Sequence, residues 1–333
     1  MLELKTPRGL VALVPEIQNE DPSPSFDLSE KEAIAHYYQE NGYVVVRGLV
    51  ASEDCQHMRD LWSSEVKPSR AHIYRQATAK AERHRFNNKG WVMNPILNLQ
   101  SIDPVLYPNF RKYAVEHILT APRLAEGFSI LFDEKPKIVQ SMYFEGNSAT
   151  WEHQDSYYLD SEMVGSMAAA WLALEDIDAE AGRFFVCPKS HLIDMGRQNS
   201  SNNIADRHEE YIQTVVSKIR ELGLEIRAPR LCRGDVLFWN AWTIHGSLDS
   251  HSSLHSRSSI TCHAIPLSHR FLQLQSRILP LNLKEINGIQ VHHPKDLAML
   301  FNRLVLLVES HMPWLFYPLK KLAVKSVVAK KNW

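Results

Sequence analysis

The region from residue 137 to residue 266 consists of short apolar stretches separated by turns, and this pattern limits the fold more than any other feature. The expected strands cover residues 137–144, 163–175, 183–187, 234–239 and 257–266. The periodicity of residues 163–175 would also permit a buried helix, but the position of this run among strands favours a strand. Many short strands with turns between them indicate an antiparallel sandwich or barrel. We therefore expect a mainly β fold with flanking helices.

A helix and a strand are predicted before this region. Ser29 and Glu32 have the spacing of a capping box, so a helix should begin there and run to Asn41. Gly42 is its expected C-terminal stop. A strand over residues 43–47 follows.

The remaining segments are assigned from composition and spacing. They are a loosely held arm with several prolines (1–27), two helical regions (52–62 and 103–132), a basic irregular segment (67–100) and a polar insertion that is a candidate lid (192–227). The basic segment is either a surface loop or a wall of the active site, since loops on a rigid scaffold often contact substrates. We expect the whole chain, residues 1–333, to form one domain.

The C-terminal extension, residues 293–333, should form two helices that are broken at Pro313. The second helix carries five lysines beside an apolar side. A basic amphipathic helix can lie on a membrane surface, but it more often packs on its own domain or on a dimer mate. A homodimer through these helices is possible, and a membrane partner is not expected.

Charge and cysteine usage exclude several classes of protein. Lys and Arg number 37 against 38 for Asp and Glu, so no overall field favours nucleic acid. The N-terminus lacks the features of a signal peptide, and no apolar run has the length of a membrane span. The four cysteines show no Cys-x-x-Cys spacing, which argues against a zinc site or a disulfide framework. A reducing, cytoplasmic location is the expectation.

The candidate metal site begins with His153 and Asp155. In an extended segment, side chains two residues apart lie on the same face. His245, far along the chain, is the leading candidate for a third ligand. Two histidines and one carboxylate with open positions opposite them are the geometry of non-haem Fe(II) oxygenases.

Other histidines are interpreted as exposed. His208 and Glu210 repeat the His-x-acid spacing, but they lie in a charged run at helical spacing that is typical of a solvated face. His251 and His255 have a spacing that would chelate a metal on a helix. Their serine-rich surroundings instead indicate a loop that faces solvent.

A series of motifs agrees in order, spacing and residue type with one known family. The motifs are Asn-Gly-Tyr-Val-Val-Val-Arg-Gly (41–48), His153-Gln-Asp155, Trp171, a turn that ends in Pro-Lys-Ser-His (188–191), Gly-Asp-Val-Leu-Phe-Trp (234–239), His245-Gly-Ser247 and Arg257. From about residue 43 to residue 266 the chain resembles the phytanoyl-CoA dioxygenase family of Fe(II)- and 2-oxoglutarate-dependent oxygenases. Lys189 and Arg183 depart from the family pattern and can reshape the substrate side. The substrate is therefore not carried over.

The resemblance implies a double-stranded β-helix, or jelly roll, with iron near one mouth. It implies that His153, Asp155 and His245 are the iron ligands. It also implies residues that contact 2-oxoglutarate: Arg257 on its C5 carboxylate, Ser247 as a hydroxyl beside that carboxylate, Trp171 packed on the co-substrate, and Gln140 as a polar neighbour of the co-substrate or substrate. Arginine suits this position because its planar fork can bind a carboxylate through two hydrogen bonds.

The implied activity uses Fe(2+), 2-oxoglutarate and O2 to hydroxylate an unactivated C–H bond of a small or mid-sized metabolite, and releases succinate and CO2. Related halogenases have a small residue in place of the carboxylate ligand, so Asp155 favours hydroxylation over halogenation. Desaturation, ring closure and epoxidation use the same ligands. The candidate substrate contacts are Tyr157, Tyr158, Arg183, Trp242 and Asn94.

Two alternative functions remain open at this stage. One is a non-catalytic jelly-roll binding protein, and the intact ligand set with Arg257 argues against it. The other is a cupin-like metalloenzyme that does not use 2-oxoglutarate, which would have no need for Arg257 or Ser247. Taken singly, His245 would more often be a structural histidine, Trp171 a core residue and Arg257 a surface cation.

Overall fold

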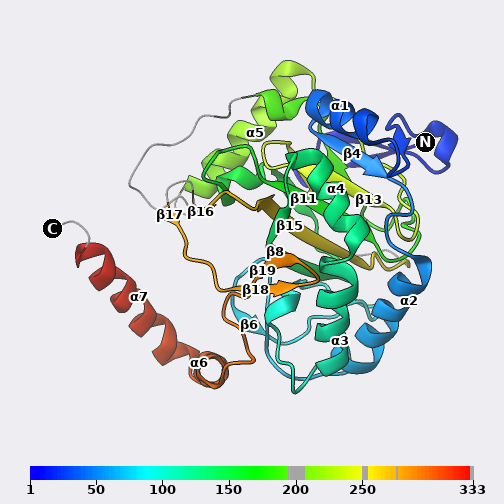
Figure 1. Cartoon of the computed structure of the whole chain (residues 1–333). Helices are drawn as coiled ribbons and strands as arrows, with labels where there is room; N and C mark the ends of the chain where they lie inside the picture. The colour runs from blue at the N-terminus through cyan, green and yellow to red at the C-terminus, as the bar shows by residue number, and fades with distance from the viewer. Residues whose placement is uncertain (194, 196–206, 250–253, 275–276, 331–333) are drawn as a thin grey trace.

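The computed structural model describes residues 1–193, 195, 207–249, 254–274 and 277–330, with side chains up to residue 321. Its centre is a large mixed sheet (Figure 1). In spatial order the strands of this sheet are β18 (Leu283–Ile286), β19 (Ile289–His292), β8 (Pro136–Phe144), β15 (Ser259–Pro266), β11 (Ala168–Ala173), β13 (Val236–Asn240), β4 (Tyr43–Val46) and β3 (Ser25–Phe26), with β7 (Ile96–Leu97) paired to β8.

A smaller sheet packs against one face of the large one. Its strands are β12 (Phe184–Val186), β14 (His245–Ser247) and β9 (Thr150–His153). Phe184 and Val186 pack with Trp171 and Trp239 of the large sheet in one buried cluster. The structure confirms the predicted mainly β jelly-roll architecture, as two facing sheets rather than a closed barrel.

Strand β11 illustrates how the sequence produces this arrangement. Ala168, Ala170 and Leu172 face the helical layer, while Ala169 and Trp171 face the smaller sheet. Both faces of the strand are covered, so its sequence is a continuous apolar run. This explains why periodicity alone did not separate strand from helix.

Helices cover the outer face of the large sheet (Figure 1). They are α1 (Lys31–Asn41), α2 (Ser52–Leu61) continued by η2 (Trp62–Val66), α3 (Pro108–Tyr113) continued by η4 (Ala114–Leu119), and α4 (Pro122–Phe132). The start of α1 corrects one prediction, because the Ser29 hydroxyl bonds to Asp27 and caps no helix. Gly42 ends α1 as predicted, with a φ of 77° that favours glycine.

The N-terminal segment is not a loosely held arm, which corrects a second prediction. β1 (Leu2–Lys5) and β2 (Val11–Val14) form a hairpin in which Ala12 and Val14 are fully buried. The Leu13 N–H donates to the Ile226 carbonyl at 3.2 Å. The N-terminal segment is therefore packed on the fold, with Pro7 in the turn of the hairpin.

The polar insertion contains α5 (His208–Leu222), which packs beside the smaller sheet. Its buried side is apolar and consists of Tyr211, Ile212, Val215, Val216 and Ile219. The predicted solvated face is therefore only one side of this helix. Residues 194 and 196–206 of the insertion, and His251 of the serine-rich loop, lie outside the described residues.

The C-terminal part adds short strands and two helices. These are β16 (Phe271–Gln273) and β17 (Arg277–Ile278), which form a sheet with β10 (Leu159–Ser161), then α6 (Leu300–His311) and α7 (Pro313–Lys330). Figure 1 shows α7 extending away from the body of the fold. No helix in the described part of the chain is long and apolar enough to span a membrane.

The remaining elements are short and lie in connections. They are η1 (Gln18–Glu20), β5 (Ile73–Tyr74), β6 (Ala81–Glu82), η3 (Leu99–Ser101), η5 (Asp155–Tyr157) and η6 (Ser190–Leu192).

Candidate active site

Strand pairing brings the three predicted metal ligands together. His153 at the end of β9 lies opposite His245 at the start of β14. Asp155 begins the turn of η5, two residues after the last residue of the strand. Its Oδ1 lies 3.7 Å from His153 Nε2 and 3.5 Å from His245 Nε2. The ligand atoms of all three residues lie within 4.8 Å of one another, close enough to hold one metal ion.

Both histidines are held in the tautomer that a metal needs. His153 Nδ1 lies 2.8 Å from the Trp151 carbonyl oxygen, and His245 Nδ1 lies 2.9 Å from that of Thr243. A carbonyl oxygen only accepts hydrogen bonds, so each Nδ1 carries the proton. In the neutral imidazole, as a metal binds it, the free lone pair is then on Nε2, which is the atom near Asp155.

The second oxygen of Asp155 is held from the large sheet. The Trp239 indole N–H donates to Asp155 Oδ2 at 2.9 Å, and His263 Nε2 lies 3.3 Å from the same oxygen. Burial alone would raise the pKa of Asp155, but the neighbouring imidazoles of His245, His263 and His153 hold it well below its usual range. Asp155 is therefore a carboxylate with Oδ1 directed at the two ligand nitrogens.

A polar stripe leads away from this cluster along β15. Arg257, Ser259, Thr261 and His263 follow one another at every second position, so their side chains lie on the same face of the sheet. All four are buried. Arg257 Nε, Ser259 Oγ, Thr261 Oγ1 and His263 Nδ1 have no hydrogen-bond partner among the described residues. Buried polar atoms usually have partners, so this stripe has the character of a binding surface.

Arg257 is a buried cation at the far end of the stripe. Its side chain is 1% exposed, and Nη1 donates to the Gly182 carbonyl at 2.6 Å. The guanidinium lies 5.2 Å from the centre of the Phe144 ring and 5.6 Å from that of Trp171. Burial lowers its pKa to about 9, which leaves it charged at neutral pH. No carboxylate in the described part of the chain forms an ion pair with it, and a buried cation without a counter-ion is costly.

Three further predicted co-substrate contacts have distinct positions. Trp171 is buried beside Arg257, and its indole N–H has no partner within the described structure. Ser247 Oγ accepts hydrogen bonds from Asn147 Nδ2 and from the Thr150 N–H. Gln140 lies opposite His263 in the pairing of β8 with β15, and its side chain lines a separate cavity.

Two of the predicted substrate contacts lie around the metal cluster. The Tyr158 ring meets His153 edge-on at 5.8 Å between ring centres, and its hydroxyl lies 2.7 Å from His208 Nε2. The Trp242 indole donates to Ser156 Oγ at 3.1 Å, next to Asp155. Tyr158 therefore contacts a predicted ligand directly.

Three other predicted substrate contacts bond to or pack on groups of the protein itself. The Arg183 guanidinium is 2% exposed and donates to backbone carbonyls, including that of Pro15 at 2.6 Å. The Asn94 side chain accepts a hydrogen bond from the Arg85 N–H and donates one to the Arg83 carbonyl, both in its own loop. Tyr157 is buried in a stack on Tyr211, with 3.8 Å between ring centres. Each side chain is thus engaged inside the protein.

Sequence reasoning missed three residues beside the cluster. Trp239 on β13 donates a hydrogen bond to Asp155, and His263 on β15 lies beside the same carboxylate. His208 on α5 contacts the Tyr158 hydroxyl. A signal for His263 was present, because it follows Arg257 at even spacing. His208 was instead interpreted as exposed because of the charges around it.

The chain has relatives among proteins of known sequence. The family model described as phytanoyl-CoA dioxygenase matches residues 38–259, which is more than half of the chain. The peroxisomal phytanoyl-CoA dioxygenase of Bos taurus is 23% identical, over 72% of this chain and 69% of that protein. The Homo sapiens counterpart is also 23% identical, over 76% of this chain and 73% of that protein.

Solved structures show the same fold. The epimerase SnoN in complex with Fe3+, alpha ketoglutarate and nogalamycin RO matches with a TM-score of 0.55 and 18% identity, over 81% of this chain and 97% of that chain. The alpha ketoglutarate dependent carbocyclase SnoK from nogalamycin biosynthesis matches with a TM-score of 0.54 and 16% identity, over 76% and 90%. At these identities the likeness concerns the fold alone.

Proposed function

Because the chain belongs to the phytanoyl-CoA dioxygenase family, we propose that it is an Fe(II)- and 2-oxoglutarate-dependent dioxygenase that hydroxylates an unactivated C–H bond of a small or mid-sized metabolite. Iron and 2-oxoglutarate are the cofactor and co-substrate that the family and the His–Asp–His cluster together support. In this proposal His153, Asp155 and His245 are the iron ligands.

One observation carries the proposal, namely the prepared ligand set. Two Nε2 atoms that are free to bind a metal and one carboxylate oxygen lie within 4.8 Å of one another. The second carboxylate oxygen is already bonded to Trp239, which favours binding of the metal through Oδ1 alone. A set of two imidazoles and one carboxylate on one side of a metal leaves positions for further ligands.

Arg257 and the stripe on β15 fit a dicarboxylate co-substrate. The buried, unpaired guanidinium would bind the C5 carboxylate, and the unpartnered Thr261 hydroxyl and Trp171 indole N–H lie along the way from the cluster. Ser247 Oγ accepts two hydrogen bonds, so its own proton remains available to a carboxylate oxygen. An enzyme without 2-oxoglutarate would have no use for this buried cation.

When bound, iron with 2-oxoglutarate and O2 supplies the oxidising power, and 2-oxoglutarate leaves as succinate and CO2. The chain positions the reactants and keeps water out. Trp239 and His263 fix the Asp155 carboxylate, while Arg257 and Trp171 hold the co-substrate in a buried slot. Tyr158, beside His153, would limit where a substrate approaches.

The retained Asp155 supports hydroxylation over halogenation, since a carboxylate ligand occupies the position that a halide would need. The same ligand set also serves other oxidations, so the product has to be measured. The test of the proposal is turnover of 2-oxoglutarate without added substrate, followed as succinate and CO2. We expect succinate with Fe(II) and O2, none when Zn(II) replaces iron, and a loss of at least tenfold in Asp155→Ala. Succinate formation that persists in Asp155→Ala would exclude the proposed ligand set.

A further inference from the structure

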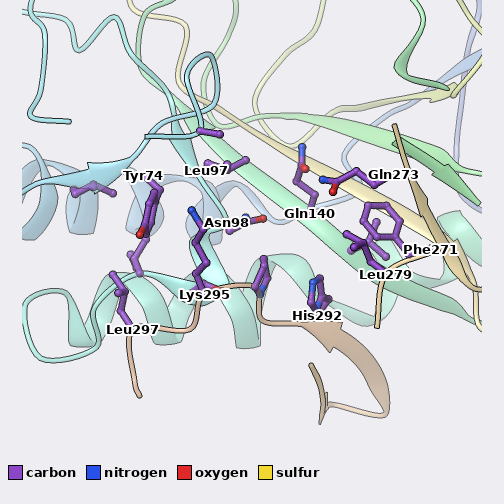
Figure 2. Close-up of a pocket in the computed structure, with 16 residues that line it drawn as sticks. Tyr74, Leu97, Asn98, Gln140, Phe271, Gln273, Leu279, His292, Lys295 and Leu297 are labelled. Carbon is purple, nitrogen blue, oxygen red and sulfur yellow. The ribbon is translucent and has the colours of Figure 1, made fainter. Parts of the chain in front are cut away.

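A cavity with a volume of about 200 Å³ lies at the edge of the large sheet. Figure 2 shows Gln140 and Gln273 at one end of this cavity, with Tyr74 and Lys295 towards the other. Its walls are mostly apolar, from Phe271, Leu279 and their neighbours. A mostly apolar cavity with a few converging polar groups is the usual form of a site for a small molecule.

Two residues of the cavity wall, Gln140 and Gln273, lie on strands that pair with strands near the metal cluster. Gln140 on β8 lies directly opposite His263 on β15, and His263 Nε2 lies 3.3 Å from Asp155. Residues opposite each other in an antiparallel pair present their side chains on one face at close range. Gln140 therefore connects the cavity floor to the cluster.

The second connection runs through β16. Gln273 lies opposite Leu159 in the pairing of β16 with β10. The next residue, Leu274, donates its N–H to the carbonyl of Tyr158 at 2.8 Å, and the ring of Tyr158 contacts His153. The two glutamine side chains thus lie at the end of the cavity that is nearer to the cluster.

The other end of the cavity is polar and holds a cation. Gln100 Nε2 donates to the His292 carbonyl, and the Leu297 N–H donates to the Ser101 carbonyl, so two separate segments are tied together here. Ser101 is 5% exposed, lines the cavity, and has a hydroxyl without a partner among the described residues.

Lys295 gives this end its preference for an acid (Figure 2). His292 Nδ1 lies 3.0 Å from the Asn282 N–H and 3.4 Å from the Asn282 carbonyl oxygen. The Lys295 ammonium lies 4.0 Å from the centre of the Tyr74 ring and has no ion pair in the described structure. The nearby Glu309 carboxylate is engaged by Tyr74 and Tyr317. No Asp or Glu lines the cavity.

We propose that this cavity binds the organic substrate of the iron centre, and that the substrate has an apolar body of roughly ten non-hydrogen atoms and one acidic group bound by Lys295. The apolar body would lie toward the glutamine end and the cluster, and the acid would lie at the Lys295 end (Figure 2). This inference rests on the proposed function for the identity of the iron centre. The preference for an acid rests on the cavity alone.

The first test uses metal-free protein and 3-phenylpropionate as the probe, with binding measured by calorimetry. Lys295→Met keeps the side-chain stem and removes the charge, so we expect affinity for the acid to fall about tenfold or more. Binding of the neutral 3-phenylpropanol should not change. Lys321→Met, at an exposed position outside the cavity, is the matched control. Leu279→Trp, which fills the cavity from a partly exposed segment, should prevent binding of both probes.

Several results would overturn the preference for an acid or the location of the site. These are no binding of 3-phenylpropionate at millimolar concentration, equal affinity in Lys295→Met, or undiminished binding in Leu279→Trp. The variants are checked for folding by thermal unfolding. None of these measurements depends on iron.

The second test asks whether the cavity serves the iron centre. In anaerobic protein loaded with Fe(II) and 2-oxoglutarate, 3-phenylpropionate should shift the visible band of the iron chelate, and Leu279→Trp should prevent the shift. A chelate band that bound probe leaves unchanged would overturn the assignment to the substrate. If 3-phenylpropionate binds in a way that depends on Lys295 but the protein develops no chelate band, the proposed function is contradicted. The cavity would then bind acids in a protein that is not an iron oxygenase.

Discussion

Trp239 donates its indole N–H to Asp155 Oδ2 at 2.9 Å, across the space between the two sheets. The tryptophan is 1% exposed and belongs to β13, whereas Asp155 follows β9 of the smaller sheet. This bond leaves Oδ1 directed at His153 and His245. The large sheet therefore orients the carboxylate that the smaller sheet presents.

Trp239→Phe should weaken metal binding while preserving the fold. The substitution removes the donor to Asp155 and keeps an aromatic ring in the core, and loss of such a supporting bond typically costs roughly 10- to 100-fold in metal affinity. Anaerobic titration with Fe(II) measures the effect. Trp62→Phe is the control, because the Trp62 indole N–H is also buried but has no partner in the described structure. Equal Fe(II) affinities in both variants would argue against an orienting role.

Arg257→Met should raise the KM for 2-oxoglutarate with little effect on Fe(II) binding. A buried charge-assisted hydrogen bond contributes about 1.5–3 kcal/mol, so a loss of roughly ten- to a hundredfold is expected. Arg257→Lys should recover only part of the lost affinity for 2-oxoglutarate, since an ammonium lacks the planar fork of the guanidinium. Succinate formation at varied 2-oxoglutarate measures this, with the exposed Arg220→Met as control. An unchanged KM would remove Arg257 from the co-substrate site.

The ligand cluster was predictable because two simple regularities specify it. Alternation of side chains placed His153 beside Asp155, and the order of the motifs added His245. The structure departs from strict alternation, since Asp155 already belongs to η5, but the two side chains still meet. Trp239 was not predictable as its partner, because that contact depends on how the two sheets pack.

Local pattern also failed where tertiary contacts decide the structure. The prolines of residues 1–27 suggested a loose arm, yet Ala12 and Val14 are fully buried against the smaller sheet and α5. Charges around His208 suggested solvent, although the other side of α5 is apolar and packed. Sequence alone also gave no sign that the Arg183 guanidinium donates to backbone carbonyls, because those carbonyls are distant in the chain or belong to a loop.

Arg183→Met should lower stability without changing the KM for 2-oxoglutarate. The guanidinium ties the Pro15 carbonyl to the carbonyls of Ile177 and Asp178, and its removal leaves buried acceptors without donors. A free-energy loss of about 2–4 kcal/mol is expected. Urea unfolding of this variant and of Arg220→Met makes the comparison. A normal midpoint with altered turnover would restore Arg183 to the substrate side.

Stability should fall as the pH is lowered from about 6.5 to about 4, in part because of His293. Burial lowers the pKa of His293 to about 4, while the unfolded chain titrates near 6.5. The unfolded state therefore takes up the extra proton, so the contribution of neutral His293 is complete above pH 6.5 and is lost on acidification. The slope from this group is about 1.4 kcal/mol per pH unit. Urea unfolding at several pH values should show a shallower dependence in His293→Asn, and an identical slope would contradict this assignment.

The most direct test of the iron centre is a titration of anaerobic, metal-free protein with Fe(II) and then 2-oxoglutarate, followed by visible absorption. We predict a charge-transfer band at one equivalent of iron, which is lost in Asp155→Ala and is weakened in Arg257→Ala at the same concentration of 2-oxoglutarate. Failure of the wild-type protein to retain iron or to develop the band would contradict the account. The fold would then belong to a binding protein rather than to an oxygenase.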